Sequence, residues 1–388
     1  MKKSGNAVSV LGALTIALSF LFFSFAEYRP NRVLTGTDIS AKELFGNGFF
    51  LLLFASLVLL FLTVLNKKSY KLMIGMFILL IVGLVLYLLG GALDDDAYNQ
   101  TVMGRMSIGG GLWVFLMGVF MVLSGNFKNY EKAILHRRLF YLAIFLIILF
   151  FLFSGHLDKL SIMKEFFNRS QTFFRQFNRH FSLAFLSVLV GILIGVPIGL
   201  LIYKSKKTNN PLLFLINLGQ TIPTLSLLGL IMVPLAFLGE RSEFLRNIGV
   251  RGVGFTPAFL VLIIYALFPI VHNTIAGLNM VDQNLLEVAS GMGMKGYQAF
   301  WKVQLPLSLP VVLGGIRTAM TQSIGNTILA GLIGGGGLGS IIFLGLAQAA
   351  PDLILLGVIP LIAMAFMLDS LLSFFIFYYQ KKVLGIKT

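Results

Sequence analysis

Residues 287–306 read EVASGMGMKGYQAFWKVQLP. This polar stretch, broken by three glycines and ended by Leu-Pro, lies in a chain of 388 residues of which 57% are hydrophobic and 12% are charged. A soluble domain of this size cannot bury so much apolar surface, whereas a lipid bilayer removes the need to bury it. The chain is therefore predicted to be an integral membrane protein, and the role of this stretch depends on the membrane face to which it is exposed.

Ten apolar runs are each close to the ~20 residues that a helix needs to cross the hydrocarbon core, so an all-α membrane fold is expected. These runs cover residues 7–26, 47–65, 72–91, 107–124, 139–155, 183–203, 212–238, 257–275, 313–335 and 353–377. The seventh run is broken by Pro223 and Pro234. Residues 1–26 also suit a cleaved signal peptide, but the apolar run exceeds the usual ~7–15 residues of a signal core, which favours a retained helix.

The charge distribution sets the orientation of these spans. With the N-terminus in the cytoplasm, the segments predicted to lie inside carry nearly all of the net charge of +15. This asymmetry is what the positive-inside rule requires, so the basic charge reports topology and not a nucleic-acid partner. Both termini are then expected on the cytoplasmic side of the membrane. The acidic run Asp94–Asp96 falls outside, where a solvated turn is a better interpretation than a cation site.

Several classes of activity are excluded by what the chain lacks. Cysteine is absent, which excludes disulfides, thiolate metal sites and cysteine nucleophiles. No Walker A pattern occurs, and the inner loop 276–312 is too short for a nucleotide-binding domain, so an ATPase would be a separate chain. The outer segment 156–182, taken as an amphipathic connector, is too short for a ligand-binding domain. Four scattered histidines lack the spacing of metal ligands and are interpreted as structural: His136, His156, His180 and His272.

The inner loop 276–312 is predicted to form a bent helix–turn–helix elbow over residues 282–304. Apolar residues at i, i+3, i+4 and i+7, from Leu285 to Met292, give one apolar face on a short helix that Asp282 could cap. The glycines at 291, 293 and 296 then permit a tight turn. A second helix is expected over 297–304, and Pro306 and Pro310 are expected to end it and redirect the chain.

Within the spans, two kinds of residue are notable. Gly191, Gly195 and Gly199 repeat every fourth residue and predict a face for close helix packing. Arg317 and Asp369 are ionisable, which is costly inside a membrane and is often functional. Arg317 lies about one turn from the inner end of its helix and can snorkel, while the deeper Asp369 is expected to pair with Arg317 or with backbone donors.

The opening stretch resembles the cytoplasmic loop of ABC importer permeases, whose pattern is Glu-Ala-Ala, three residues, Gly, nine residues, Ile, one residue, Leu-Pro. The matching positions are Glu287, Ala289, Gly293, Leu305 and Pro306, while Val288 and Val303 depart mildly. The resemblance implies a coupling helix that docks in a groove of the ATPase. The residues assigned to this coupling loop are Glu287, Ala289, Ser290, Gly291, Gly293, Lys295, Gly296, Leu305 and Pro306. An interfacial amphipathic helix is the alternative.

Three flanking stretches indicate which group of ABC importer permeases the chain resembles. They are GQTIPTLSLLGL at 219–230, the segment 256–278 and IGNTILAGLIGGGGLGSIIFLGL at 324–346. They look like the permeases of osmoprotectant importers, which carry glycine betaine, choline or carnitine, and most resemble the longer YehY type. His272 stands where arginine is commoner and Asn326 where a small residue is usual, so the solute within that class stays open. Residues 1–155, with five spans, carry no motif, and their role stays open too.

The resemblance implies a type I (MetI-like) importer fold for residues 183–388, in a bacterial inner (cytoplasmic) membrane. Its expected partners are a second permease copy or a shorter paralogue, a cytoplasmic ATPase dimer that binds ATP and Mg, and an external substrate-binding protein. This chain would bind no cofactor itself. A candidate gate, or equally a tight turn closing the ninth span, is formed by Gly334, Gly335, Gly336, Gly337 and Gly339. The alternatives are an ABC permease for another solute such as methionine, an ion-coupled secondary transporter, or a scaffold without transport. No solute-binding residues are assigned.

Overall fold

The computed structural model describes residues 3–30, 35–65, 67–93, 104–127, 133–205, 211–382 and 385. The predicted class, a helical membrane protein, is confirmed, since eight of the described helices are long and apolar enough to cross a membrane and three shorter apolar helices accompany them. The chain divides into two compact units, Met1–Asn168 and Arg169–Thr388, and the boundary between them in the sequence falls within the predicted connector 156–182. The predicted turn at Asp94–Asp96 lies outside the described residues.

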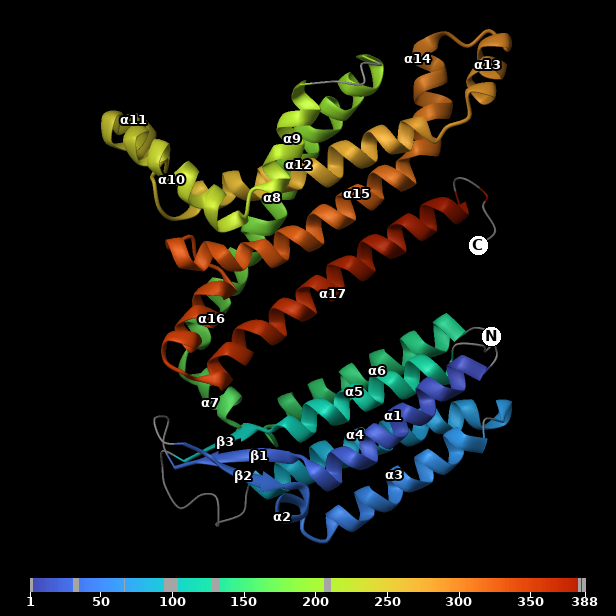
Figure 1. The fold of residues 1–388 in the computed structure, drawn as a ribbon, viewed down its shortest axis with the longest axis vertical. Coiled ribbons are helices and arrows are strands. Elements are labelled where there is room, and N and C mark those ends of the chain that lie inside the picture. Colours follow the sequence, from blue (N-terminus) through green and yellow to red (C-terminus); the bar gives the residue numbers. More distant parts are fainter. Residues whose placement is uncertain are drawn as a thin grey trace. The chain divides into compact units, whose positions relative to one another are not determined.

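The first unit is a helical bundle with a small sheet at one end (Figure 1). Its elements are α1 (Lys3–Phe22), β1 (Ser24–Arg29), β2 (Thr37–Ser40), α2 (Ala41–Phe45), α3 (Gly48–Leu65), η1 (Lys68–Tyr70), α4 (Lys71–Leu93), β3 (Arg105–Ile108), α5 (Gly110–Asn126), α6 (Ala133–Phe153) and α7 (Ser161–Asn168). Helices α1 and α5 approach closely because Gly12 faces Gly118: a Cβ on Gly12 would lie 2.8 Å from the Gly118 carbonyl oxygen. Lipid gives helices no hydrophobic reason to associate, so such small-residue contacts hold them together.

The sheet was not predicted from the sequence. Its antiparallel strands, in the order β2-β1-β3, are six and four residues long, too short for an alternating pattern to stand out. Residues of β1 and β3 were assigned to the ends of the first and fourth spans, and those boundaries were wrong. Helix α1 ends at Phe22 and α5 begins at Gly110.

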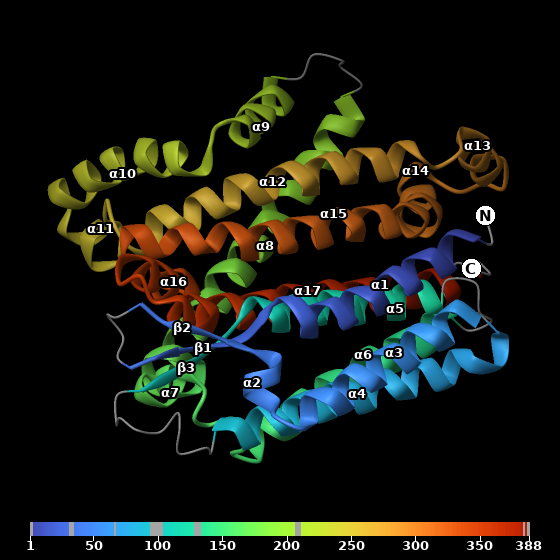
Figure 2. The same ribbon diagram turned by 60° about the horizontal axis from the view of Figure 1, so that its bottom comes forward.

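The second unit contains the candidate site. Its elements are α8 (Ser170–Ser205), α9 (Pro211–Thr221), α10 (Thr224–Arg241), α11 (Glu243–Asn247), α12 (Phe255–Asn279), α13 (Gln283–Gly291), α14 (Gly296–Ala299), the π-helix η3 (Phe300–Gln304), α15 (Leu305–Asn326), the 3₁₀-helix η4 (Thr327–Ile333), α16 (Leu338–Ala347) and α17 (Pro351–Lys382). Helix α12 packs against both α8 and α15. Helices α13 and α14 lie at one end of α12 and α15, whereas α16 and the α10–α11 tip lie at the other (Figures 1 and 2).

The glycine stripe of α8 is a close-packing face, as predicted, and the structure shows that its partner is α12. A Cβ added to each glycine would meet a side chain of α12. The distance would be 3.0 Å from Gly191 to Ala266, 2.9 Å from Gly195 to Ile270 and 2.7 Å from Gly199 to Thr274. The three glycines thus let the two backbones approach along two turns of helix.

The seventh span was expected to be one run broken at two prolines, but only Pro223 breaks it. Helix α9 ends at Thr221 and α10 begins at Thr224, because the residue before a proline is disfavoured in the α conformation. The Tyr265 hydroxyl donates to the Ile222 carbonyl, which satisfies a backbone group freed at the break. Pro234 lies inside α10, which continues through it.

The expected helix end at Pro306 and Pro310 was also wrong. The chain stays helical from η3 into α15 through both prolines. Just before Pro306, the Leu305 amide donates to the Phe300 carbonyl, an i→i+5 bond that widens the helix and accommodates the proline. Pro310 has no N–H for the Pro306 carbonyl, and that carbonyl instead accepts a hydrogen bond from the Tyr379 hydroxyl at 3.3 Å.

Candidate functional site

The elbow, residues 282–304, is built as the sequence predicted up to its second helix. The Asp282 carboxylate accepts a hydrogen bond from the Asn284 amide at 2.9 Å and caps α13. Gly293 then adopts a φ of +82°, a conformation that glycine reaches without strain. The Lys295 amide donates to Gln298 Oε1 at 2.8 Å, which starts α14.

The predicted apolar face of α13 divides into an inward and an outward part. Ala289 is only 3% exposed, so the small side chain proposed as a contact surface in fact packs within the elbow. Val288 and Met292 are 60% and 74% exposed, and Glu287 and Ser290 are exposed as well. The outward apolar face therefore has no cover among the described residues of this chain.

None of the three elbow glycines is required by packing against other described residues of the chain. No described atom lies within 4 Å of a Cβ built on Gly291, Gly293 or Gly296. All three are exposed, together with Lys295. Of the three, only Gly293 has a backbone conformation that disfavours a side chain. At Gly291 and Gly296 the missing side chain therefore only leaves open space on an exposed surface.

The elbow is anchored to the rest of its unit through Gln304. This side chain is buried and its Nε2 donates to the Tyr203 hydroxyl of α8 at 2.6 Å. It also donates to the Leu278 carbonyl of α12 at 3.4 Å. Leu305 and Pro306, the last residues of the predicted motif, are half-buried and begin α15. A displacement of the elbow therefore acts directly on α8, α12 and α15.

Arg317 and Asp369 form an ion pair, the first of the two arrangements expected for Asp369 from the sequence. Arg317 Nε lies 2.5 Å from Asp369 Oδ1, and Nη2 lies 2.7 Å from Oδ2, so the contact is bidentate. The side chains are 42% and 33% exposed. Because the pair joins α15 to α17 inside the apolar spans, each charge is neutralised by the other where water is scarce.

The predicted gate glycines lie at the end of the unit opposite the elbow, between η4 and α16. Gly334 ends η4 with a φ of +74°, and Gly336 and Gly337 have φ values of +83° and +90°. Gly339 lies in the first turn of α16, where a Cβ would be 1.9 Å from the Ile328 carbonyl oxygen. The run is thus a tight turn in structure, and its role as a gate stays a prediction. We call residues 334–337 the glycine loop.

Side chains of α8 that the sequence did not single out hold the glycine loop. Gln176 Oε1 accepts a hydrogen bond from the Gly337 amide at 2.7 Å. Arg179 Nε donates to the Gly335 carbonyl at 3.2 Å, and its guanidinium lies over the Phe255 ring at 4.3 Å. Spacing along one helix could have shown that Gln176 and Arg179 share a face, but not which loop they contact.

The four histidines contact protein groups in separate parts of the chain. His180 is fully buried and hydrogen-bonds to backbone groups of Ile324 and Leu338. The other contacts are His272 Nε2 to Asn217 Oδ1 at 2.7 Å, His156 Nε2 to the Tyr87 carbonyl at 2.9 Å, and stacking of His136 on Phe127. These contacts agree with structural roles.

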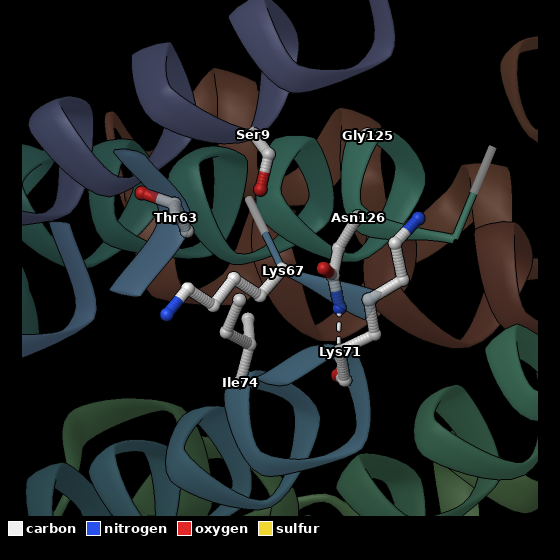
Figure 3. A pocket seen from close by; sticks show the side chains of 7 residues that line it. All are labelled: Ser9, Thr63, Lys67, Lys71, Ile74, Gly125 and Asn126. Atoms are coloured by element: carbon white, nitrogen blue, oxygen red, sulfur yellow. Dashed lines mark hydrogen bonds between the residues drawn. The ribbon is translucent and has the colours of Figure 1, made fainter. Parts of the chain in front are cut away.

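A small polar cavity lies in the first unit where α1, α3, α4 and α5 meet (Figure 3). It is lined by Ser9, Thr63, Lys67, Lys71, Ile74, Gly125 and Asn126. The buried Ser9 hydroxyl has no hydrogen-bond partner among the described residues, while Asn126 Nδ2 donates to the Lys71 carbonyl at 2.8 Å. The ammonium groups of the two lysines extend away from each other in Figure 3, and the space suits about one water molecule.

Two family models match this architecture. The model described as "Binding-protein-dependent transport system inner membrane component" matches residues 187–385. The model described as "ABC transporter permease YehY, N-terminal domain" matches residues 4–163, the part without motifs.

Several known permeases are similar to about half of this chain. The glycine betaine/carnitine/choline transport system permease OpuCB of Bacillus subtilis is 36% identical over 44% of this chain and 71% of its own length. The carnitine transport permease OpuCB of Listeria monocytogenes is 38% identical over 45% and 72%. The osmoprotectant import permease OsmW of Salmonella typhimurium is 38% identical over 45% and 75%. The inward-facing MetNI methionine ABC transporter gives a TM-score of 0.46 at 20% identity, covering 54% of this chain and 97% of the solved chain.

The first family model spans more than half of the chain and contains the elbow, the ion pair and the glycine loop. The chain therefore belongs to the family of inner membrane components of binding-protein-dependent transport systems, and is a permease subunit.

Proposed function

We propose that this permease imports osmoprotectants of the glycine betaine, choline and carnitine class, with energy from a separate cytoplasmic ATPase that docks on the elbow. The solutes named for three similar permeases support this solute class. A quaternary ammonium solute is held by aromatic faces through cation–π attraction, and the 37 phenylalanines and 11 tyrosines are too many to single out a site. The other partners proposed are an external substrate-binding protein and a second permease, either another copy or a shorter paralogue.

The single observation that carries the ATPase proposal is the exposed face of the elbow. Val288 and Met292 are apolar and open beside glycines with free space, while Gln304 holds the same elbow to α8 and α12. Such a surface suits a protein partner that approaches closely and pushes on a rigid support. ATP binding would close the ATPase dimer and move the two elbows, so that the pathway opens alternately to each side. The elbow then lies in the cytoplasm, with both termini on that side.

The experiment compares two glycines with similar backbones at opposite ends of the unit. Gly293→Asp adds bulk and charge at the elbow, whereas Gly249→Asp does so at a φ of +93° between α11 and α12. We expect both variants to insert in the membrane, and only Gly293→Asp to lose co-purification with the ATPase or solute-stimulated ATP hydrolysis. Unchanged co-purification and hydrolysis in Gly293→Asp would contradict the docking site.

The solute class needs its own measurement. Proteoliposomes with permease, ATPase and binding protein should take up radiolabelled glycine betaine or choline, and unlabelled carnitine should compete for uptake. Methionine serves as the control for an amino-acid importer. Competition by methionine, with none by the quaternary ammonium compounds, would overturn the proposed solute class and leave the permease assignment intact.

A further inference from the structure

The part of α8 distant from the elbow presents three polar side chains on one face. Gln176, Arg179 and His180 have the spacing i, i+3 and i+4, which places them side by side on a helix. The three side chains differ in solvent exposure: Arg179 is exposed, Gln176 is half-buried and His180 is fully buried. The set therefore reaches from solvent into the interior of the second unit.

All three side chains bind backbone groups of one short segment. Gln176 and Arg179 hold the Gly337 amide and the Gly335 carbonyl. The Leu338 amide donates to His180 Nδ1 at 3.2 Å, and this fixes the histidine tautomer. Because Nδ1 accepts, the ring proton of the neutral histidine lies on Nε2, which donates to the Ile324 carbonyl of α15 at 3.0 Å.

These contacts satisfy groups that the segment cannot pair by itself. The backbone leaves helical geometry at Gly334 and turns through two further glycines with positive φ. The consecutive amides of Gly337 and Leu338 then donate to side chains of α8. Irregular backbone at membrane depth is tolerated only when protein or water satisfies its polar groups. If the glycine loop moved from α8, the amides of Gly337 and Leu338 would lose their acceptors together.

The loop also has no room for a side chain on this face. A Cβ on Gly336 would lie 3.0 Å from Arg179 Cγ and 3.1 Å from Gln176 Oε1, and one on Gly337 would lie 3.1 Å from His180 Nδ1. The fit is therefore close as well as hydrogen-bonded.

We propose that Gln176, Arg179 and His180 form a latch that holds the glycine loop against α8 and keeps the pathway closed at this end, so that opening requires the latch to release. The proposal deepens the transport function proposed above, because it assigns positioning residues to the gate. It concerns the closed state of the permease alone and does not depend on which solute is carried or on where the ATPase docks.

The latch can be tested by labelling a cysteine placed beneath it. The chain has no cysteine of its own, so a single introduced thiol gives no background. Ser323→Cys is suitable because Ser323 is 1% exposed, its hydroxyl has no hydrogen-bond partner among the described residues, and it precedes Ile324, whose carbonyl His180 holds. A membrane-impermeant maleimide then reports how often this end opens in proteoliposomes of the full chain.

The matched variants are Gln176→Leu and Gln176→Glu, both added to Ser323→Cys. Leucine removes the acceptor of the Gly337 amide, whereas glutamate keeps an oxygen at that position. Losing one hydrogen bond in the closed state should raise the open fraction, and hence the labelling rate, about 3- to 10-fold. We expect this increase for Gln176→Leu and a rate within about twofold of the parent for Gln176→Glu.

Arg179→Gln provides a second variant at an exposed position, in case Gln176→Leu does not fold. It should also raise the labelling rate, because it removes the contact to the Gly335 carbonyl. Labelling at the parent rate in a correctly folded Gln176→Leu or Arg179→Gln protein would overturn the latch, as would an equal increase in Gln176→Glu. Since no ATPase is present, failure of the elbow experiment leaves this result unaffected, and failure here leaves the elbow proposal unaffected.

Discussion

Gly339→Ala is the substitution whose effect the structure defines most sharply. A Cβ at this position would lie 1.9 Å from the Ile328 carbonyl oxygen and 2.7 Å from the carbonyl carbon, whereas real Cβ atoms essentially never come within 3.0 Å of such atoms. The new methyl group would have to retreat by the difference of 1.1 Å, from 1.9 to 3.0 Å. It meets backbone and not the tip of a flexible side chain, so η4 and α16 must separate as rigid elements.

Overpacking in a well-packed core costs about 1–3 kcal/mol, and a clash between two backbones belongs at the upper end of this range. We therefore expect Gly339→Ala to lower the free energy of unfolding by about 3 kcal/mol. Gly314→Ala is the matched control, because Gly314 also lies in a helix and no described atom is within 4 Å of its built Cβ. An alanine there should raise stability by up to ~1 kcal/mol through helix propensity.

Both variants can be measured by equilibrium unfolding in mixed micelles with increasing SDS, followed by circular dichroism. The expected result is a wide separation between the two midpoints, with Gly339→Ala below wild type and Gly314→Ala at or above it. Equal midpoints would refute the reasoning, because they would mean that α16 moves away from η4 at little cost and that the close approach is not a structural requirement.

Two further outcomes are expected. A double-mutant cycle with Arg317→Gln and Asp369→Asn should give a coupling energy of about 1 kcal/mol in the same unfolding assay, since the pair is bidentate but partly exposed; a coupling near zero would mean that the pair does not form in the membrane. The Ser40 amide and hydroxyl donate to the Glu43 carboxylate and lower its pKa. A carboxylate whose pKa is lowered in the folded protein stabilises the fold at pH values above its ordinary pKa of about 4.3. This stability is lost as the pH falls through the folded-state pKa. As the pH is lowered from about 6 to about 3, the thermal unfolding midpoint of the wild type should therefore fall more than that of Glu43→Gln. Parallel curves of midpoint against pH would contradict the capping interaction.

The long apolar helices and the elbow could be predicted because their signals are local. Hydropathy finds a span without reference to its neighbours, and the cap at Asp282 and the turn at Gly293 depend on residues within a few positions. The pair of Arg317 and Asp369 could be predicted for another reason: each charge in an apolar helix needs a partner, and few were available.

The errors came from effects that depend on distant residues. Pro306 and Pro310 were expected to end a helix because proline removes hydrogen bonds, but a π-turn and the hydroxyl of Tyr379 compensate. Ala289 was assigned to the coupling loop as a small residue that allows a partner to come close, although the fold of the elbow turns its side chain inward. The latch could not be found from the sequence, because Gln176 and Gly337 are 161 positions apart and no local pattern joins them.

Helix α8 is one unbroken helix of 36 residues, which at 1.5 Å per residue extends about 54 Å, well beyond a hydrocarbon core of about 30 Å. Tyr203 at one end meets the elbow, and Gln176 towards the other end meets the glycine loop. Each residue of an α-helix turns by about 100°, so the facing of these two contacts is fixed by the number of residues between them. One inserted residue would rotate one contact away from its target, whereas eleven would complete about three turns and restore the facing. The number of residues between the two contacts thus fixes the direction in which each contact faces, as well as the distance between them.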